Sequence, residues 1–110
     1  MQITSRELKR VNVVSVSGRV DSAASPEMEK ALQDLLDGRR NQIVMELADV
    51  EYMSSAGLRA LVSALKAAKK VGGDVVIARP SARVREVIDL AGLTSVFTVY
   101  EDTLEAVGSF

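Results

Sequence analysis

The stretch Met53-Ser54-Ser55-Ala56-Gly57-Leu58 joins the two patterns that indicate how this chain folds. Before it stands Ile43-Val44-Met45-Glu46-Leu47, whose mostly apolar composition predicts a strand covered on both faces, followed by a turn over residues 48–54. After it, apolar residues recur at helical spacing up to the glycine pair at residues 72–73, beginning with Leu58, Leu61, Val62 and Leu65. Serine hydroxyls are therefore predicted where a buried strand passes into the N-terminus of a helix.

The rest of the chain alternates between strand and helix patterns. β-Branched residues predict a strand over residues 11–17, ended by Gly18, and the weaker pattern of residues 3–8 indicates a short first strand. Ser25, followed by proline, predicts a helix with Ser25 as its N-cap, and Gly38 marks the end of that helix. The remaining predicted elements are a strand over residues 74–78, a helix over 84–91, a strand over 96–100 and a short helix capped by Asp102 or Thr103. This alternation favours helices packed on a sheet with parallel strand pairs.

Length and composition predict one compact domain over residues 1–110. Apolar residues make up 47% of the chain, and the net charge is −1, without the basic excess that nucleic-acid binding normally requires. No apolar run approaches the ~20 residues of a membrane span, so direct membrane insertion is not expected. The charged N-terminus lacks the core of a signal peptide, and we predict a cytoplasmic location.

Histidine and cysteine are absent, which removes most of the usual catalytic and metal-binding chemistry. Without histidine the chain has no Ser-His-Asp triad and lacks the commonest zinc ligand. Ser55-Ala56-Gly57 matches the second half of a G-x-S-x-G elbow, but Met53 replaces the first glycine. Glycine motifs that bind phosphates are also missing. We therefore predict a protein that is not an enzyme and that has no catalytic residue, cofactor or metal site.

Ser55 has two interpretations that the residue pattern alone leaves open. A serine at a strand-to-helix turn is most often an N-cap, which satisfies a free backbone N–H. Alternatively, a phosphate on Ser55 would meet the free N–H groups and the positive dipole end of the helix. Arg59, four residues on, either pairs with such a phosphate or is a solvated surface charge. Asp21 is either a turn residue or, if both preceding strands point the same way, a neighbour of Ser55.

Two known kinds of domain share this alternation of elements. A receiver domain needs an acidic pair after its first strand and a lysine after its last, and residues 16–18 and 100–101 supply neither. Residues 16–21, 44–50 and 52–58 instead resemble a STAS domain, and in particular the bacterial anti-sigma factor antagonists of the SpoIIAA/RsbV type. The resemblance implies an α/β fold with a mixed β-sheet of four to five strands packed with about four α-helices.

The resemblance also implies a partner-switching cycle. In that family the unphosphorylated protein binds an anti-sigma factor that is also a serine kinase, and this binding frees the sigma factor. The kinase then phosphorylates a serine that aligns with Ser55, and a PP2C-type phosphatase reverses the modification. The protein is expected to be a monomer or a weak dimer. The implied partner surface comprises Asp21, Ser22, Ser54, Ser55, Ala56, Gly57 and Arg59, together with the exposed face of the helix that follows the serines.

The serine motif departs from the family pattern, which commonly reads Asp-Ser-Ser/Thr-Gly-Leu-Gly. Ser54 stands in place of the aspartate, Ala56 in place of the second hydroxyl residue, and Arg59 in place of the last glycine. A second hypothesis is therefore a STAS scaffold subunit that is never phosphorylated and serves a signalling or transporter-associated complex. The two hypotheses differ in whether partner binding depends on the state of Ser55.

Overall fold

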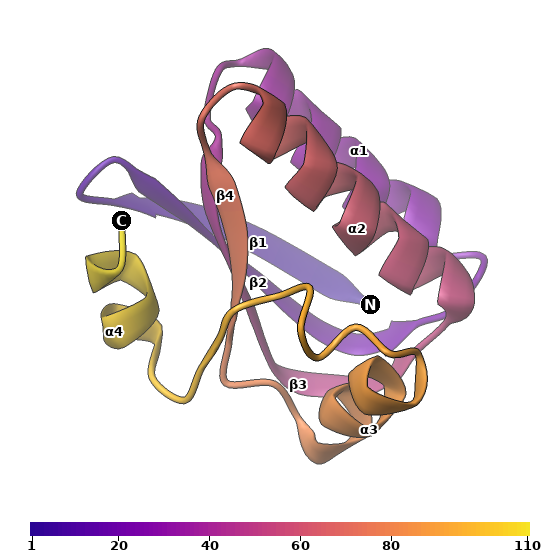
Figure 1. The fold of residues 1–110 in the computed structure, drawn as a ribbon. Helices are drawn as coiled ribbons and strands as arrows, with labels where there is room; N and C mark the ends of the chain where they lie inside the picture. The colour runs from indigo at the N-terminus through magenta and orange to yellow at the C-terminus, as the bar shows by residue number, and fades with distance from the viewer.

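The computed structural model describes residues 1–110 and contains a five-stranded sheet with four helices (Figure 1). The strands lie in the order in which they occur along the chain; β1 and β2 are antiparallel, and the other neighbouring strands are parallel. This arrangement confirms the predicted mixed sheet and helix number. The elements are β1 (Gln2–Leu8), β2 (Val11–Val20), α1 (Ser25–Asp37), β3 (Gln42–Met53), α2 (Ser55–Lys70), β4 (Asp74–Ala78), α3 (Ala82–Leu90), β5 (Val99–Tyr100) and α4 (Thr103–Gly108).

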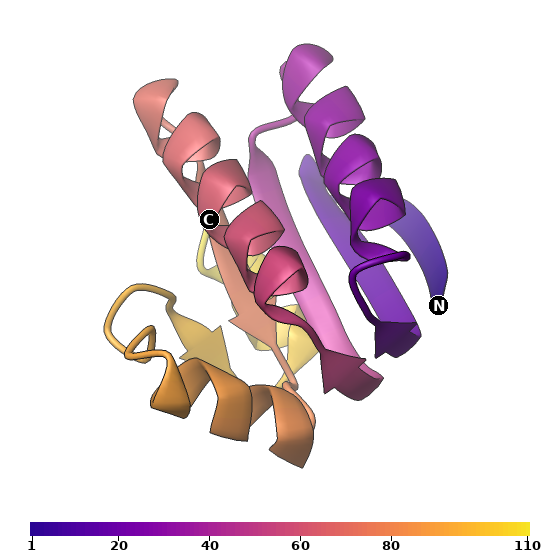
Figure 2. The same ribbon diagram turned by 90° about the vertical axis from the view of Figure 1, so that its right-hand side faces the viewer.

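The helices divide between the two faces of the sheet. Helices α1 and α2 lie side by side over one face, and α3 lies near one end of the strands (Figure 2). The main hydrophobic core fills the space between these helices and the alternate side chains of β2, β3 and β4. Helix α4 packs Ala106 and Val107 on the opposite face against a smaller apolar cluster that includes Val13, Val44 and Val76. The two clusters explain why β3 and β4 are almost continuously apolar.

Strand β3 is longer than the sequence pattern predicts, and the predicted turn over residues 48–54 is wrong. The strand continues to Met53 because its second half pairs with the end of β2, where Val20 lies opposite Met53. Two register shifts interrupt this pairing and disturb the alternation of side chains on which the prediction depended. Gly18 likewise does not end β2, but adopts a φ of +85° inside the strand at one of these shifts.

At the ends of elements, two smaller predictions are corrected and one alternative is decided. Ser25 is not an N-cap but the first residue of α1; it is buried, and its hydroxyl donates to the carbonyl of Ser22. The last strand is only Val99–Tyr100, because Phe97 turns into the main core before the strand begins. Of the two caps proposed for the terminal helix, Asp102 is the one used. No helix has both the length and the apolar character needed to cross a membrane.

Candidate functional site

The parallel pairing of β2 and β3 brings Asp21 and the two serines to the same end of the sheet. The backbone N–H of Ser54 donates to the carbonyl of Val20 at 2.8 Å, so the residues that follow the two strands start from neighbouring positions. Asp21 follows Val20 directly, and Ser55 follows Ser54 as the first residue of α2. The condition for their proximity, that both strands point the same way, is therefore met.

The two serines at the start of α2 have different structural roles. Ser54 is the N-cap: its Oγ accepts a hydrogen bond from the backbone N–H of Gly57 at 3.1 Å, and only 8% of the residue is exposed. Ser55 is exposed, and its hydroxyl has no hydrogen-bond partner within the chain. The capping role and the exposed hydroxyl thus belong to neighbouring serines, and the side chain of Ser55 is free for modification or contact.

Gly57 fixes how closely the start of α2 approaches the strands. A Cβ at this position would lie 2.5 Å from Sδ of Met53 and 3.0 Å from Cγ1 of Val20, both of which are buried. A side chain here would force the buried side chains of Met53 and Val20 to shift, and glycine lets the helix pack at this distance without displacing them. The position of Ser55 is therefore set by tight packing of the helix N-terminus on the ends of β2 and β3.

Asp21 shapes the loop that leads into α1. Its carboxylate accepts a hydrogen bond from the N–H of Ala24 at 2.8 Å, and its carbonyl accepts one from the N–H of Ser25 at 2.9 Å. These bonds stabilise a turn that leaves Ser22 exposed beside it. Asp21 therefore has a clear structural role, and it lies at the same end of the sheet as the serines.

A groove of about 470 Å³ begins at Ser55 and follows α2. The apolar side chains of Leu58 and Val62 line it, and Arg59, which has no ion pair, lines it one turn beyond Ser55. The residues that line it are Ser55, Leu58, Arg59, Val62, Ser63, Lys66, Ala91 and Leu93. No local pattern in the sequence indicates that Lys66 and Leu93 share this groove, because the two residues lie 27 positions apart in the chain.

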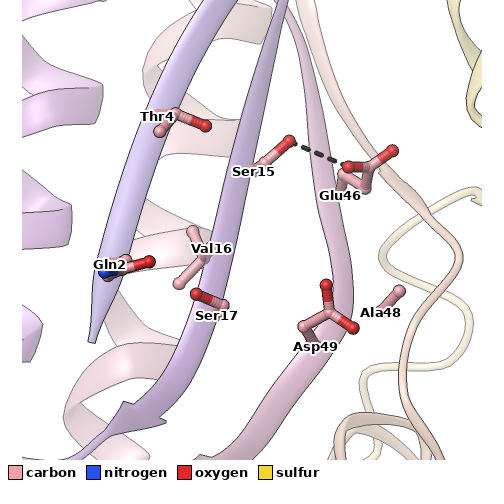
Figure 3. Close-up of a pocket in the computed structure, with 8 residues that line it drawn as sticks. All are labelled: Gln2, Thr4, Ser15, Val16, Ser17, Glu46, Ala48 and Asp49. Atoms are coloured by element: carbon pink, nitrogen blue, oxygen red, sulfur yellow. Dashed lines mark hydrogen bonds between the residues drawn. The ribbon is translucent and has the colours of Figure 1, made fainter.

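A second, polar hollow of about 140 Å³ lies on the face of the sheet that also carries α4 (Figure 3). Glu46 dominates it: Oε1 accepts a hydrogen bond from the Ser15 hydroxyl at 2.9 Å, and Oε2 accepts one from the Thr103 hydroxyl. The bond from Thr103 is the main reason that the pKa of Glu46 lies below its ordinary value, while burial acts in the opposite direction. The Asp49 carboxylate points into the same hollow.

The geometry favours a structural role for the Glu46 hollow. The Glu46 side chain is 18% exposed, and both of its oxygens are already satisfied by hydroxyl groups of the chain. No three side chains of the metal-binding types come together anywhere in the molecule. The exposed hydroxyl of Ser55 and its groove therefore remain the stronger candidate for function.

The fold and this site define a small α/β domain that presents an exposed serine at a helix N-terminus. The model of the STAS domain family matches residues 2–106, and the chain belongs to that family. Over 90 residues the chain is 32% identical to the anti-sigma-B factor antagonist of Staphylococcus epidermidis, a match that covers 82% of this chain and 83% of that protein.

Solved structures of related proteins share the whole fold. An anti-sigma factor antagonist from Mycobacterium paratuberculosis superposes with a TM-score of 0.89 at 27% identity, covering 98% of this chain and 92% of that one. The anti-sigma factor antagonist SpoIIAA in its unphosphorylated form superposes with a TM-score of 0.83 at 20% identity, covering 96% and 93%. These likenesses agree with the resemblance to the SpoIIAA/RsbV type that the sequence motifs indicate.

Proposed function

We propose that this chain is an anti-sigma factor antagonist that is switched off by phosphorylation of Ser55. The single observation that carries the proposal is that Ser54 caps the helix, whereas the hydroxyl of Ser55 is exposed. The relatives named as anti-sigma factor antagonists support the choice of partner class. In this proposal the chain acts by binding, and the chemistry belongs to a partner that is both an anti-sigma factor and a serine kinase.

A phosphate on Ser55 is compatible with the folded state. It would add nearly two negative charges beside the free N–H groups of the first helical turn, where the helix dipole favours an anion. The guanidinium of Arg59, one turn further on and without an ion pair, supplies a cation within reach. We therefore expect the modification to change the surface charge of α2 without unfolding the helix.

The proposed partner surface centres on this charge. It comprises Asp21, Ser22, Ser54, Ser55, Ala56, Gly57 and Arg59, together with the groove that runs from Ser55 to Leu93. A dianion placed in a desolvated contact weakens binding unless the partner matches it with a cation. A PP2C-type phosphatase would restore the binding form by removing the phosphate.

The first test of this proposal is the mass of the intact protein after incubation with ATP and an extract of its own source. We expect one added phosphate on the wild-type chain and none on Ser55→Ala. Ser5→Ala is the matched control, because Ser5 is an exposed serine on β1, outside the proposed partner surface, and its loss should not prevent the modification. Phosphate retained by Ser55→Ala, or lost from Ser5→Ala, would contradict the assignment.

The second test is calorimetric binding of the anti-sigma partner to the variants. Ser55→Ala should bind like the unphosphorylated protein, whereas Ser55→Glu should bind at least about tenfold more weakly, which corresponds to ~1.4 kcal/mol. Equal affinities for the two variants would refute the switch. A partner that co-purifies whatever the state of Ser55 would instead favour the hypothesis of a scaffold subunit.

A further inference from the structure

The C-terminal half of α2 carries a further hollow of about 550 Å³, distinct from the Glu46 hollow, that continues the groove beside Ser55. The groove and this further hollow share Lys66, which lines both of them. Leu65 and Val96 are the apolar residues of the further hollow, and Lys69 and Lys70 stand beside them. Below it is called the lysine hollow, defined by Leu65, Lys66, Lys69, Lys70 and Val96.

The lysine hollow combines an apolar floor with a positive rim on which two of the three lysines have no ion pair. Leu65 is 5% exposed and forms the floor, whereas Val96 is 43% exposed and leaves apolar surface open to solvent. Helix α2 contains no acidic residue, and the only carboxylate within 4.0 Å of these ammonium groups is that of Asp74, 3.8 Å from Nζ of Lys69. The ammonium groups of Lys66 and Lys70 have no ion pair, so the rim can accept carboxylates from another molecule.

We propose that the lysine hollow docks an acidic segment of the protein partner, anchored by an apolar side chain between Leu65 and Val96. The inference rests on the proposed function, because it extends the partner surface from Ser55 along the same helix. From Ser55 to Lys70 is about 22 Å at 1.5 Å per residue, so one bound segment could span both hollows. Charge complementarity indicates that this segment is acidic, because carboxylates would pair with the three lysines.

Two other anionic partners fit the lysine hollow less well. Proteins that bind a membrane surface insert aromatic or leucine side chains, but the apolar face of α2 is already packed on the sheet and the hollow has no aromatic residue. Proteins that bind single-stranded nucleic acid stack bases on aromatic rings, which the hollow also lacks. A segment of a protein needs only the small apolar floor and the cationic rim that are present.

The lysine hollow should act independently of phosphorylation. By the helix rise, a phosphate on Ser55 lies about 16 Å from Lys66, the nearest of the three lysines, and about 22 Å from Lys70, both beyond the Debye length of ~10 Å at 0.1 M salt. Contacts at the lysine hollow should therefore contribute equally to partner affinity whether or not Ser55 is phosphorylated, whereas phosphorylation of Ser55 itself lowers that affinity. This separation allows the inference to be tested without any kinase.

The test is a titration of the isotope-labelled chain with a blocked peptide of Glu-Glu-Leu-Leu repeats, followed by nuclear magnetic resonance. We expect shift changes centred on residues 65–70 and 93–97, and binding that weakens as salt is raised. The triple variant Lys66→Gln, Lys69→Gln, Lys70→Gln should bind about tenfold more weakly, because it loses three exposed ion pairs. Ser55→Glu should bind the peptide as the wild type does.

The matched control removes three positive charges that lie outside the lysine hollow. It combines Lys9→Gln on the β1–β2 hairpin, Lys30→Gln on α1 and Arg83→Gln on α3. This variant should keep wild-type affinity, and a peptide of Lys-Lys-Leu-Leu repeats should not bind. Equal losses in the two triple variants, or shifts centred on other residues, would overturn the inference. So would lysine-dependent sedimentation with anionic phospholipid vesicles in place of peptide binding, or lysine-dependent self-association of the chain. A failure of Ser55 phosphorylation would leave all of these outcomes unchanged.

Discussion

Two adjacent serines differ because one faces the interior and the other faces solvent. The Ser54 side chain turns back over the first turn of α2 and satisfies the N–H of Gly57, which would otherwise be buried without a partner. The family motif commonly has aspartate here, and an aspartate is an equally good N-cap. The replacement by serine in this chain therefore keeps the cap and removes a negative charge beside Ser55.

This role of Ser54 predicts the effect of two substitutions. Ser54→Ala should lower the free energy of unfolding by about 1 kcal/mol, whereas Ser54→Asp should stay near the wild-type value. Urea unfolding at neutral pH measures both changes, with Ser63→Ala as a control that should shift stability by less than about 0.5 kcal/mol. If Ser54→Asp were as unstable as Ser54→Ala, the capping bond would not be what Ser54 contributes.

Between elements, the end of α2 and the start of β4 depend on a close contact with the loop before β3. The carbonyl of Asn41 accepts the N–H of Asp74 at 2.9 Å, and Nδ2 of Asn41 donates to the carbonyl of Val71 at 3.2 Å. Gly73 lies against this residue so closely that a Cβ would overlap the Asn41 carbonyl and stand 2.7 Å from its Cβ. Gly72, with φ of +81°, completes the turn. The glycine pair therefore both ends the helix and docks two loops.

A substitution at Gly73 should consequently destabilise the protein more than its place in a loop suggests. We expect Gly73→Ala to cost about 1–3 kcal/mol, because the backbone of Asn41 cannot move without loss of its hydrogen bonds. Gly108→Ala is the control, since a Cβ there meets nothing within 4 Å; this variant should be as stable as the wild type or up to about 1 kcal/mol more stable, because Gly108 lies in α4. Thermal unfolding of both variants would decide the matter; similar melting temperatures would show that the loop relaxes freely.

Across the whole molecule, Glu46 ties the sheet to its terminal helix. It receives hydroxyl bonds from Ser15 on β2 and from Thr103, which is 57 residues distant in the chain. Nη1 of Arg79 lies 3.9 Å from the same carboxylate. These contacts hold α4 over the smaller apolar cluster, so the charge of Glu46 helps to keep the second face of the sheet covered.

The lowered pKa of Glu46 gives this contact a defined pH dependence. A carboxyl whose pKa is lower in the folded state than its ordinary value of 4.5 stabilises the fold above that value. The stabilisation is lost as the pH falls through the folded-state pKa. We therefore expect the wild type to be more stable than Glu46→Gln at neutral pH, with a difference that shrinks below pH 4.5.

Urea unfolding midpoints measured from neutral pH into the acid range would check this expectation. Glu105→Gln is a suitable control, because Glu105 is exposed on α4 and has no ion pair. Its difference from the wild type should stay near zero throughout. A difference between wild type and Glu46→Gln that did not change with pH would exclude a pH-dependent role for the charge.

Much of the fold and part of the site could be predicted from local patterns. The periodicity from Leu58 to Leu65 indicated α2, and the mixed sheet with four helices followed from the alternation and the family motifs. The length of β3 could not be predicted, because its second half is a strand only through its pairing with β2, and register shifts hide the alternation. Residue patterns also predicted a serine hydroxyl at the start of α2, but they did not indicate whether Ser54 or Ser55 is the N-cap.

The sequence by itself determined the types of element, the membership of the STAS family and the absence of histidine and cysteine chemistry. Those properties reside in local periodicity and composition, which need no knowledge of distant contacts. Only the tertiary structure decided that Ser54 is buried and Ser55 exposed, that Lys66 and Leu93 line one groove, and that Thr103 bonds to Glu46. These facts depend on strand register and on helix packing, in which residues far apart in the chain become neighbours.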